Sequence, residues 1–265
     1  MAHGARSGRR RAARMRSRPA ALLAAVFVAL LFVGLSAAVP SMRQSLGIGP
    51  AAPSADRGGW TEWDPQAYPD YYRVVGEAEV DLELEPGEVR YEGLDELGRT
   101  GRVAALVTPE MAEAGSERER EDISDVHPSG WGHNEEVAIQ MPDGSTYHGY
   151  LFNRSHLLAK SLGGDDADYN LVTGTRTQNV GDNRGQDGGM AYTEGLARDW
   201  LRSHPDGTLY YSAAPVYEGS ELVPRSVIVD VCSSDGELDL EVEVFNAALG
   251  YDIDYATGSF SAAGE

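Results

Sequence analysis

One segment of the chain carries a histidine and two asparagines at a spacing that could support chemistry. His156 ends an apolar, strand-like stretch, and Asn170 and Asn179 follow within 23 residues. A histidine can accept a proton from water near neutral pH. An asparagine oxygen is a suitable ligand for a hard cation such as Mg²⁺. A general base beside a bound cation is the set that metal-assisted hydrolysis of a phosphodiester needs.

Each of these residues, taken alone, also has an ordinary structural explanation. A histidine after a strand is more often structural than catalytic, and an asparagine often caps a helix or stabilises a turn. Glu194, 15 residues after Asn179, would by itself be a solvated helix residue. Their combination favours function, because a hairpin followed by a helix could hold one divalent cation opposite His156.

The elements that must position these residues follow from local pattern. Residues 137–141 and 146–152 are strand-like and flank Pro142-Asp-Gly144, a turn signal, so they predict a hairpin. Residues 190–203 place Tyr192, Leu196 and Trp200 on one face of an amphipathic helix. Three further strands are predicted at 208–215, 226–232 and 238–245.

The last of these strands alternates strictly. Leucines and valines at 238, 240, 242 and 244 alternate with Asp239, Glu241 and Glu243, which predicts one buried and one wet face. Hairpin-paired strands with few helices indicate an α+β fold with a central antiparallel sheet. Cys232, the only cysteine, lies in an apolar run and is expected to be a buried core residue rather than a nucleophile.

The N-terminus has the layout of an export signal. Seven arginines precede an uncharged run from Ala20 to Val39. The run is also long enough to cross a bilayer, so a cleaved signal and a retained anchor both remain open. We expect residues 1–40 to be this signal or anchor, 41–85 a linker and N-terminal extension, and 86–265 the folded domain.

Charge argues against simple electrostatic adhesion to nucleic acid. Beyond residue 40 the chain has 15 basic and 42 acidic residues, a net charge of −27. Residues 151–202 are nearly balanced, with six basic and seven acidic side chains. Phosphate binding would therefore depend on a metal and on four cations near the motif: Arg154, Lys160, Arg176 and Arg184. An acidic run, Asp165-Asp-Ala-Asp168, indicates a solvated loop, with calcium binding as the alternative.

Several separate stretches, in order, resemble the exported DNA/RNA non-specific endonucleases of Gram-positive bacteria, a group that includes streptococcal DNases and DNA-entry nucleases. The matching stretches are Tyr91–Arg99, Pro128–Trp131, Tyr150–Asn179, Tyr210–Tyr217 and Asp252–Gly258. The resemblance implies the ββα-metal (His-Me finger) fold. It also implies His156 as general base, Asn179 as the Mg²⁺ ligand, and Asn170 and Glu194 as further active-site residues. Many members read Asp-Arg-Gly-His where this chain has Asn153-Arg-Ser-His156.

The expected protein is thus an exported, Mg²⁺-dependent endonuclease without sequence preference, in which Mn²⁺ could replace Mg²⁺. DNA is the expected substrate, and whether RNA is also cleaved stays open. It would be secreted or anchored at the outer face of the membrane, with the membrane as a partner only if the segment is retained. No protein partner is expected. The alternatives are a toxin-type effector nuclease and a catalytically inactive, surface nucleic-acid-binding module with the same fold.

Overall fold

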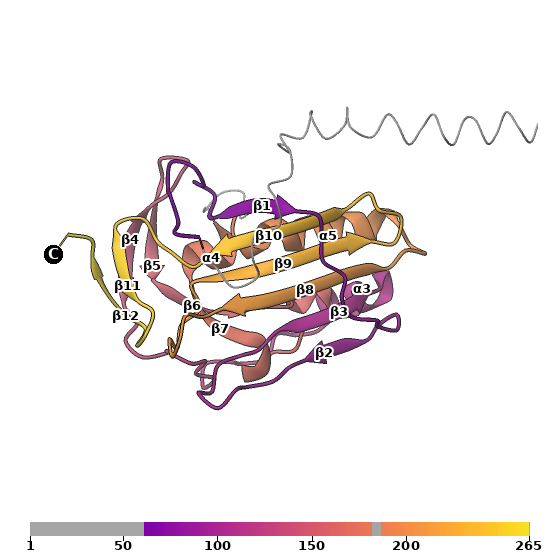
Figure 1. Ribbon diagram of the computed structural model, residues 1–265, viewed down its shortest axis with the longest axis horizontal. Helices are drawn as coiled ribbons and strands as arrows, with labels where there is room; N and C mark the ends of the chain where they lie inside the picture. The colour runs from indigo at the N-terminus through magenta and orange to yellow at the C-terminus, as the bar shows by residue number, and fades with distance from the viewer. Residues whose placement is uncertain (1–60, 182–186, 265) are drawn as a thin grey trace, which may run out of the picture. The chain divides into compact units, whose positions relative to one another are not determined.

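A six-stranded antiparallel sheet is the centre of the computed structural model, which describes residues 61–181 and 187–264 (Figure 1). Every neighbouring pair in it is antiparallel. Its strands, in spatial order, are β1 (Tyr72–Gly76), β10 (Asp239–Phe245), β9 (Ser226–Ser233), β8 (Leu209–Val216), β3 (Val103–Val107) and β2 (Val89–Tyr91). The predicted α+β class and antiparallel sheet are confirmed, and β8, β9 and β10 lie within about one residue of the predicted strands.

Two helices cover one face of this sheet (Figure 1). α5 (Met190–Ser203) has the bounds predicted from its periodicity, and its Ala197, Trp200 and Leu201 are buried against valines of the sheet. α3 (Pro109–Glu117) begins at Thr108, whose hydroxyl accepts a hydrogen bond from the amide of Met111. Burial of these apolar side chains makes the sheet and α5 a rigid platform for the segments between them.

The segment that carries the sequence motif is a hairpin followed by a short helix. β6 (Phe152–His156) pairs antiparallel with β7 (Leu171–Thr175), and α4 (Arg176–Val180) follows directly. Two 3₁₀ turns, Lys160–Leu162 and Asp168–Asn170, lie in the connection between the strands. Thr175 caps α4 by accepting a hydrogen bond from the amide of Gln178. The predicted hairpin-then-helix arrangement is therefore present.

Two smaller hairpins pack on each other at one end of the domain. β4 (Glu136–Gln140) pairs with β5 (Thr146–Tyr150), and β11 (Tyr251–Asp254) pairs with β12 (Ser259–Ala262). Ile139, Met141, Leu151 and Phe152 form a second, smaller core beneath them. The stretch 146–152, expected as one strand, ends as β5 at Tyr150, because the backbone of Leu151 bonds instead to Glu135 and Arg176.

The folded region begins before residue 86, the boundary expected from the sequence. β1 lies at the edge of the main sheet, and the backbone of 78–79 donates to Asp239 and Asp230. Asp81 pairs with Arg102, which lowers the pKa of Asp81 to about 2. Residues 61–85 therefore pack on the domain, because they supply partners for the carboxylates of Asp230, Asp239 and Glu243 in β9 and β10.

The same packing overturns two expectations about burial. Glu243, predicted to face water, is only 1% exposed, because Arg73 of β1 covers it with an ion pair of 2.7 Å. Cys232, predicted to be buried, is half-buried on that same face, and its burial raises the pKa of the thiol.

Among the described residues, no helix is long and apolar enough to cross a membrane. The predicted signal or anchor at 20–39 lies outside the described residues.

Candidate active site

His156 lies at the end of β6 and pairs with a buried carboxylate. Its Nε2 is 2.7 Å from Oδ1 of Asp166, and the two side chains are 12% and 1% exposed. Burial lowers the pKa of the His156 imidazole, although the hydrogen bond and charge of Asp166 act in the opposite direction. The ring is therefore neutral at neutral pH. If Nε2–H donates to Asp166, then Nδ1 is the nitrogen that can accept a proton.

Asp166 is held in place by the loop that precedes β4. Its other oxygen accepts a hydrogen bond from the amide of Glu121 at 3.1 Å. Burial would raise the pKa of Asp166, but this amide and His156 outweigh it, so the pKa is lowered and the group is a carboxylate. The run 165–168, expected as a solvated or calcium-binding loop, instead supplies the partner of the candidate base. Asp165 of the same run accepts a hydrogen bond from the Tyr169 hydroxyl.

Asn170, which the resemblance implies as a further active-site residue, lies in the 3₁₀ turn before β7. Its side chain is fully buried. Its Oδ1 accepts from the amide of Leu158, and its Nδ2 donates to the carbonyls of Leu158 and Asp165. Both donors and the acceptor of the amide are thus engaged by backbone of the segment that links His156 to Asp166. Asn170 holds this loop together.

Asn179, the predicted metal ligand, is brought beside the strand that carries His156. Its Oδ1 accepts a hydrogen bond of 3.2 Å from the hydroxyl of Ser155, the residue before His156. Gly174 permits this approach, because a Cβ there would lie 2.2 Å from Oε1 of Gln178 and 2.7 Å from Cβ of Ser155. Asn179 therefore lies against β6 beside Ser155, one residue before His156.

Asn179 opens onto a cavity of about 530 Å³. The rest of its lining comes from the loop after α3, the end of β5 and β6, namely Arg120, Ile123, Trp131, Gly132, Asn134, Tyr150, Phe152, Asn153 and Arg154. None of these described residues is a carboxylate, and two are arginines, so a phosphate is not repelled there. An amide oxygen that faces such a space fits Mg²⁺, which keeps most of its waters when protein binds it.

Arg120 is a site residue that the sequence reasoning missed. It is exposed, lines the cavity, and its charge lowers the pKa of both His156 and Glu194. The sequence offered no signal, because Arg120 lies in an alternating run, Glu117-Arg-Glu-Arg-Glu, that is typical of a solvated surface. Only the folding of this loop onto the β6–β7 connection brings it to the site.

Glu194 lies on α5 with its side chain 16% exposed. Burial raises the pKa of its carboxyl to about 7, against the opposing charge of Arg198, whose guanidinium is 3.5 Å away. Arg198 also donates to the hydroxyl of Ser161, in the connection between β6 and β7. Glu194 thus belongs to the helix that supports the site, and the positive charge of Arg120 acts to lower the pKa of its carboxyl.

The four predicted substrate-binding cations are not all placed alike. Arg154 lines the cavity, but its Nε and Nη2 donate to the carbonyls of Val126 and Ser124 and its guanidinium stacks on Trp131. Lys160 donates to the carbonyl of Gly115 in α3, and Arg176 lies over the ring of Tyr147. Neither lines the cavity. Arg184 lies outside the described residues.

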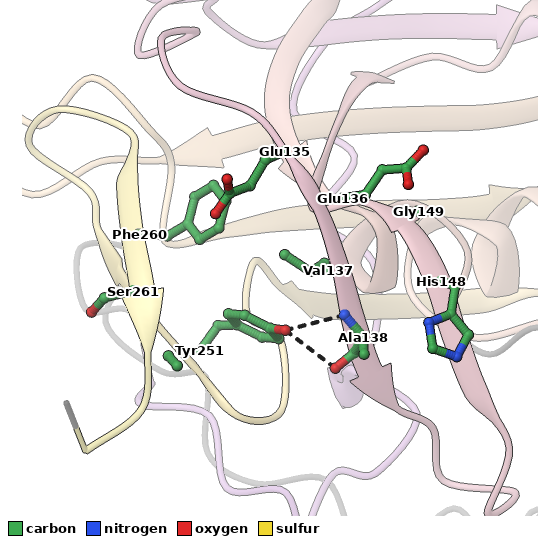
Figure 2. Close-up of a pocket in the computed structure, with 10 residues that line it drawn as sticks. Glu135, Glu136, Val137, Ala138, His148, Gly149, Tyr251, Phe260 and Ser261 are labelled. Carbon is green, nitrogen blue, oxygen red and sulfur yellow. Dashed lines mark hydrogen bonds between the residues drawn. The ribbon is translucent and has the colours of Figure 1, made fainter.

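A second cavity, of about 610 Å³, lies between the β4–β5 and β11–β12 hairpins (Figure 2). Glu135, Glu136 and His148 line it, and the Tyr251 hydroxyl bonds to the backbone of Ala138 at its floor (Figure 2). None of the predicted site residues lines it. Its carboxylates make it a poor place for a phosphate, so the Asn179 cavity is the better candidate.

Comparison with known proteins identifies relatives of this chain. The model of the DNA/RNA non-specific endonuclease family matches residues 74–256. A deoxyribonuclease of Streptococcus dysgalactiae subsp. equisimilis is 32% identical over 240 residues, 72% of each chain. The structure of Sda1 nuclease with a bound zinc ion is 34% identical, with a TM-score of 0.72 over 76% of this chain and 100% of that one.

A more distant structure shares the fold. NucA from Streptococcus agalactiae, solved with a magnesium ion bound, is 23% identical, with a TM-score of 0.59 over 74% of this chain and 88% of that one. The hairpin, the helix after it and the central sheet are thus the ββα-metal architecture that the resemblance implied. This chain is a nuclease and belongs to the DNA/RNA non-specific endonuclease family.

Proposed function

We propose that this protein is an endonuclease that hydrolyses internal phosphodiester bonds of DNA without sequence preference. RNA is a second substrate in this proposal. The observation that carries the proposal is the place of Asn179, which lines a cavity with two arginines and lies against β6, the strand that ends in His156. Its Oδ1 accepts a hydrogen bond from Ser155, the residue before His156. The family membership and the deoxyribonuclease relative support the substrate class.

His156 acts as the general base in this proposal. Its Nδ1 accepts a proton from the attacking water, while Asp166 keeps the ring oriented through Nε2 and stabilises the imidazolium that forms. The water attacks phosphorus in line with the leaving 3′ oxygen, which gives 5′-phosphate ends. Burial lowers the pKa of His156, which favours the neutral ring that a general base needs.

Phosphate is held by the arginines and the amide that line the cavity. Arg120 is exposed there and can bind a phosphate oxygen, while Arg154 stacks on Trp131 and shapes the wall. Asn179 would hold Mg²⁺, or Mn²⁺ in its place, and such an ion supplies charge neutralisation on the phosphate oxygens. Glu194 and Asn170 position the surrounding loop and helix.

The proposal includes export from the cell. The arginines before Ala20–Val39 and the apolar run itself support it. An enzyme that acts outside the cell would degrade nucleic acid for nutrition, uptake or competition.

Plasmid digestion by the full chain tests the proposal. The wild type and His148→Ala, an exposed histidine outside the site, should cut plasmid in Mg²⁺, and EDTA should stop both. In His156→Ala the rate of cleavage should fall about 10²–10⁴-fold.

Three other outcomes would contradict this proposal. An intact plasmid with wild-type protein would favour the inactive binding module. Equal digestion by His156→Ala would remove His156 from the mechanism. If expression inside a host cell is toxic, and co-expression of a neighbouring gene relieves that toxicity, the effector-toxin alternative would be favoured.

A further inference from the structure

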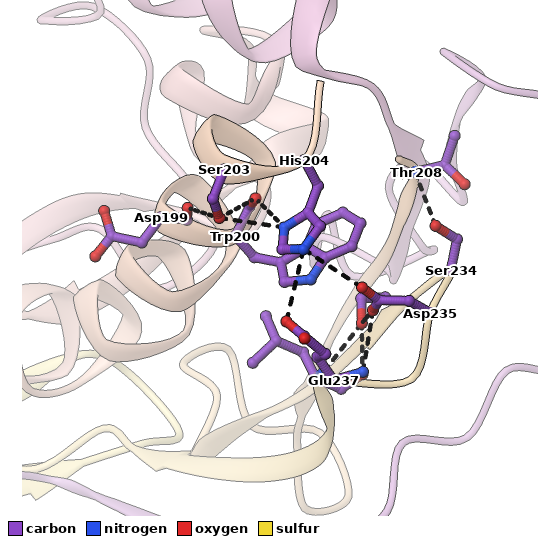
Figure 3. A network of polar contacts seen from close by, with 10 residues as sticks. Asp199, Trp200, Ser203, His204, Thr208, Ser234, Asp235 and Glu237 are labelled. Atoms are coloured by element: carbon purple, nitrogen blue, oxygen red, sulfur yellow. Dashed lines mark hydrogen bonds and ion pairs between the residues drawn. The ribbon is translucent and has the colours of Figure 1, made fainter. Parts of the chain in front are cut away.

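A group of three potential metal ligands lies at the C-terminal end of α5 (Figure 3). His204 directly follows the helix, and Asp235 and Glu237 lie in the turn between β9 and β10. Nε2 of His204 is 3.5 Å from Oδ2 of Asp235 and 3.6 Å from Oε2 of Glu237. One ligand atom of each residue lies within 4.8 Å of the other two.

The ring of His204 is fixed in one orientation. Its Nδ1 is 2.9 Å from the carbonyl of Trp200 and 3.1 Å from the hydroxyl of Ser203, and the ring stacks on the Trp200 indole at 4.3 Å. A backbone carbonyl can only accept, so Nδ1 carries the hydrogen. In the neutral ring the lone pair is then on Nε2, directed at the two carboxylates (Figure 3). Metal-binding histidines are typically oriented by such a bond to a carbonyl.

Asp235 is oriented as firmly as the histidine. Its Oδ1 accepts hydrogen bonds from the Ser233 hydroxyl at 2.7 Å and from the amide of Glu237 at 3.0 Å. Oδ2 is therefore the oxygen that faces His204. The turn itself, and not a flexible side chain, places this oxygen.

The distances suit a cation between the groups better than direct contact. A charge-assisted hydrogen bond between nitrogen and carboxylate is typically about 2.7–2.9 Å, shorter than the 3.5 and 3.6 Å found here. Ligand bonds of about 2.1 Å to a tetrahedral zinc ion separate neighbouring ligand atoms by about 3.4 Å. Both His204 distances match that separation.

We propose that His204, Asp235 and Glu237 bind a divalent transition-metal ion, with Zn²⁺ the best fit, and that water completes its coordination. Imidazole together with carboxylates suits zinc, whereas magnesium prefers oxygen ligands alone. The site is separate from Asn179, since its residues come from the C-terminal end of α5 and the β9–β10 turn. The ion would link the end of the helix to the sheet.

Metal titration of the full chain tests this site. EDTA-treated, desalted protein would be titrated with Zn²⁺ by calorimetry and with Co²⁺ by visible absorption. Wild type, the control His148→Ala and the active-site variant Asn179→Ala should all retain one zinc equivalent that His204→Ala lacks. Co²⁺ bound there should give an absorption band that His204→Ala loses. Glu237→Gln, an exposed and conservative change, should weaken that equivalent at least about 10-fold.

Stability and activity give independent readouts. Free zinc at about 100 times its dissociation constant should raise the Tm of wild type by about 5–10 °C, but not that of His204→Ala. Mg²⁺-dependent plasmid cleavage should be the same in both. Equal zinc stoichiometry and equal Co²⁺ spectra in wild type and His204→Ala would overturn the proposal, and His204 would then be an ordinary ion-pair partner. If wild-type protein binds zinc at this site but does not cleave plasmid, the proposed nuclease function would be contradicted while the metal site would stand.

Discussion

At the scale of single residues, the site depends on how burial and a few contacts tune two titratable groups. His156 is kept neutral by burial and oriented by Asp166, while Glu194 is pushed toward its protonated form. The positive charge of Arg120 acts to lower the pKa of both residues. The residue-scale predictions concern these two pKa shifts.

Replacing Asp166 by Asn should lower both the rate and the pKa of the base. The Asp166 carboxylate raises the pKa of His156, so its removal should move the acid limb of the pH–rate profile to lower pH. Loss of orientation should reduce kcat by about 10–100-fold. Asp168→Asn, an exposed neighbour on the same loop, is the matched control and should leave both unchanged. An acid limb that moves to higher pH would contradict this role for Asp166.

Glu194→Gln should change how stability depends on pH. The pKa of Glu194 is about 7 in the folded protein against 4.5 ordinarily, so the folded state binds its proton more tightly. The stabilisation that this tighter proton binding gives the folded state is complete below pH 4.5 and is lost as the pH rises through about 7. Without metal, Glu194→Gln should therefore gain up to about 3 kcal/mol in unfolding free energy over wild type between pH 5 and 8.

Urea unfolding in EDTA at the two pH values measures this gain. Glu113→Gln, on the exposed side of α3, is the control and should follow the wild type at both. A parallel loss of stability in wild type and Glu194→Gln would show that Glu194 is not the group responsible.

At the scale of elements, the hairpin and helix depend on close packing of side chains over one glycine of β7. The side chains of Ser155 of β6 and Gln178 of α4 occupy the space that a Cβ of Gly174 would need. The loop between β6 and β7 is then closed by Asn170, which bonds to backbone at both ends of the segment between His156 and Asp166. Geometry of the site is thus set by packing around glycine and by one buried amide.

Gly174→Ala should separate β6 from α4. The added Cβ would clash with Ser155 and Gln178, at a cost of about 1–3 kcal/mol in unfolding free energy. Nuclease activity should fall further than stability, since the Ser155–Asn179 bond would be strained. Gly76→Ala, where a Cβ meets nothing within 4 Å, provides the control in chemical denaturation and plasmid assays. Full activity in Gly174→Ala would contradict the need for this close approach.

At the scale of the whole molecule, the segment before residue 86 completes the sheet. It supplies β1, the partner of buried Glu243, and amides for Asp230 and Asp239. The strong negative charge, −27 beyond residue 40, therefore does not lie only on the surface, and part of it must be compensated inside the fold. The prediction at this scale concerns that compensation.

A chain that starts at residue 86 should be much less stable than one that starts at 61. It would lose β1, the edge strand that pairs with β10, and the amides of 78–79 that donate to Asp239 and Asp230. Arg73→Ala in the longer chain should leave buried Glu243 without its ion pair, at a typical cost of about 3–5 kcal/mol. Arg90→Ala, in an exposed pair with Glu88, should cost less than about 1 kcal/mol. Urea denaturation of the variants measures these differences. Equal midpoints for the two chains would restore the boundary at 86.

Local pattern in the sequence predicts the elements, whereas the candidate base and metal ligand are implied by the resemblance to the endonuclease family. Periodicity predicts α5 and the long strands, because each buries a regular stripe of apolar side chains against the same core. The β6–β7–α4 unit is local too, since its parts follow one another within 29 residues, 152–180.

The tertiary structure alone decided which distant groups meet. Arg120, Asp166 and Arg73 carry no local signal, because a charged residue in a polar run looks the same whether it is solvated or paired. Asn170 likewise became a buried clamp only when the loop folded around it. Burial strengthens each of these polar contacts by removing the competing water, and burial is a property of the packed chain rather than of any short stretch of it.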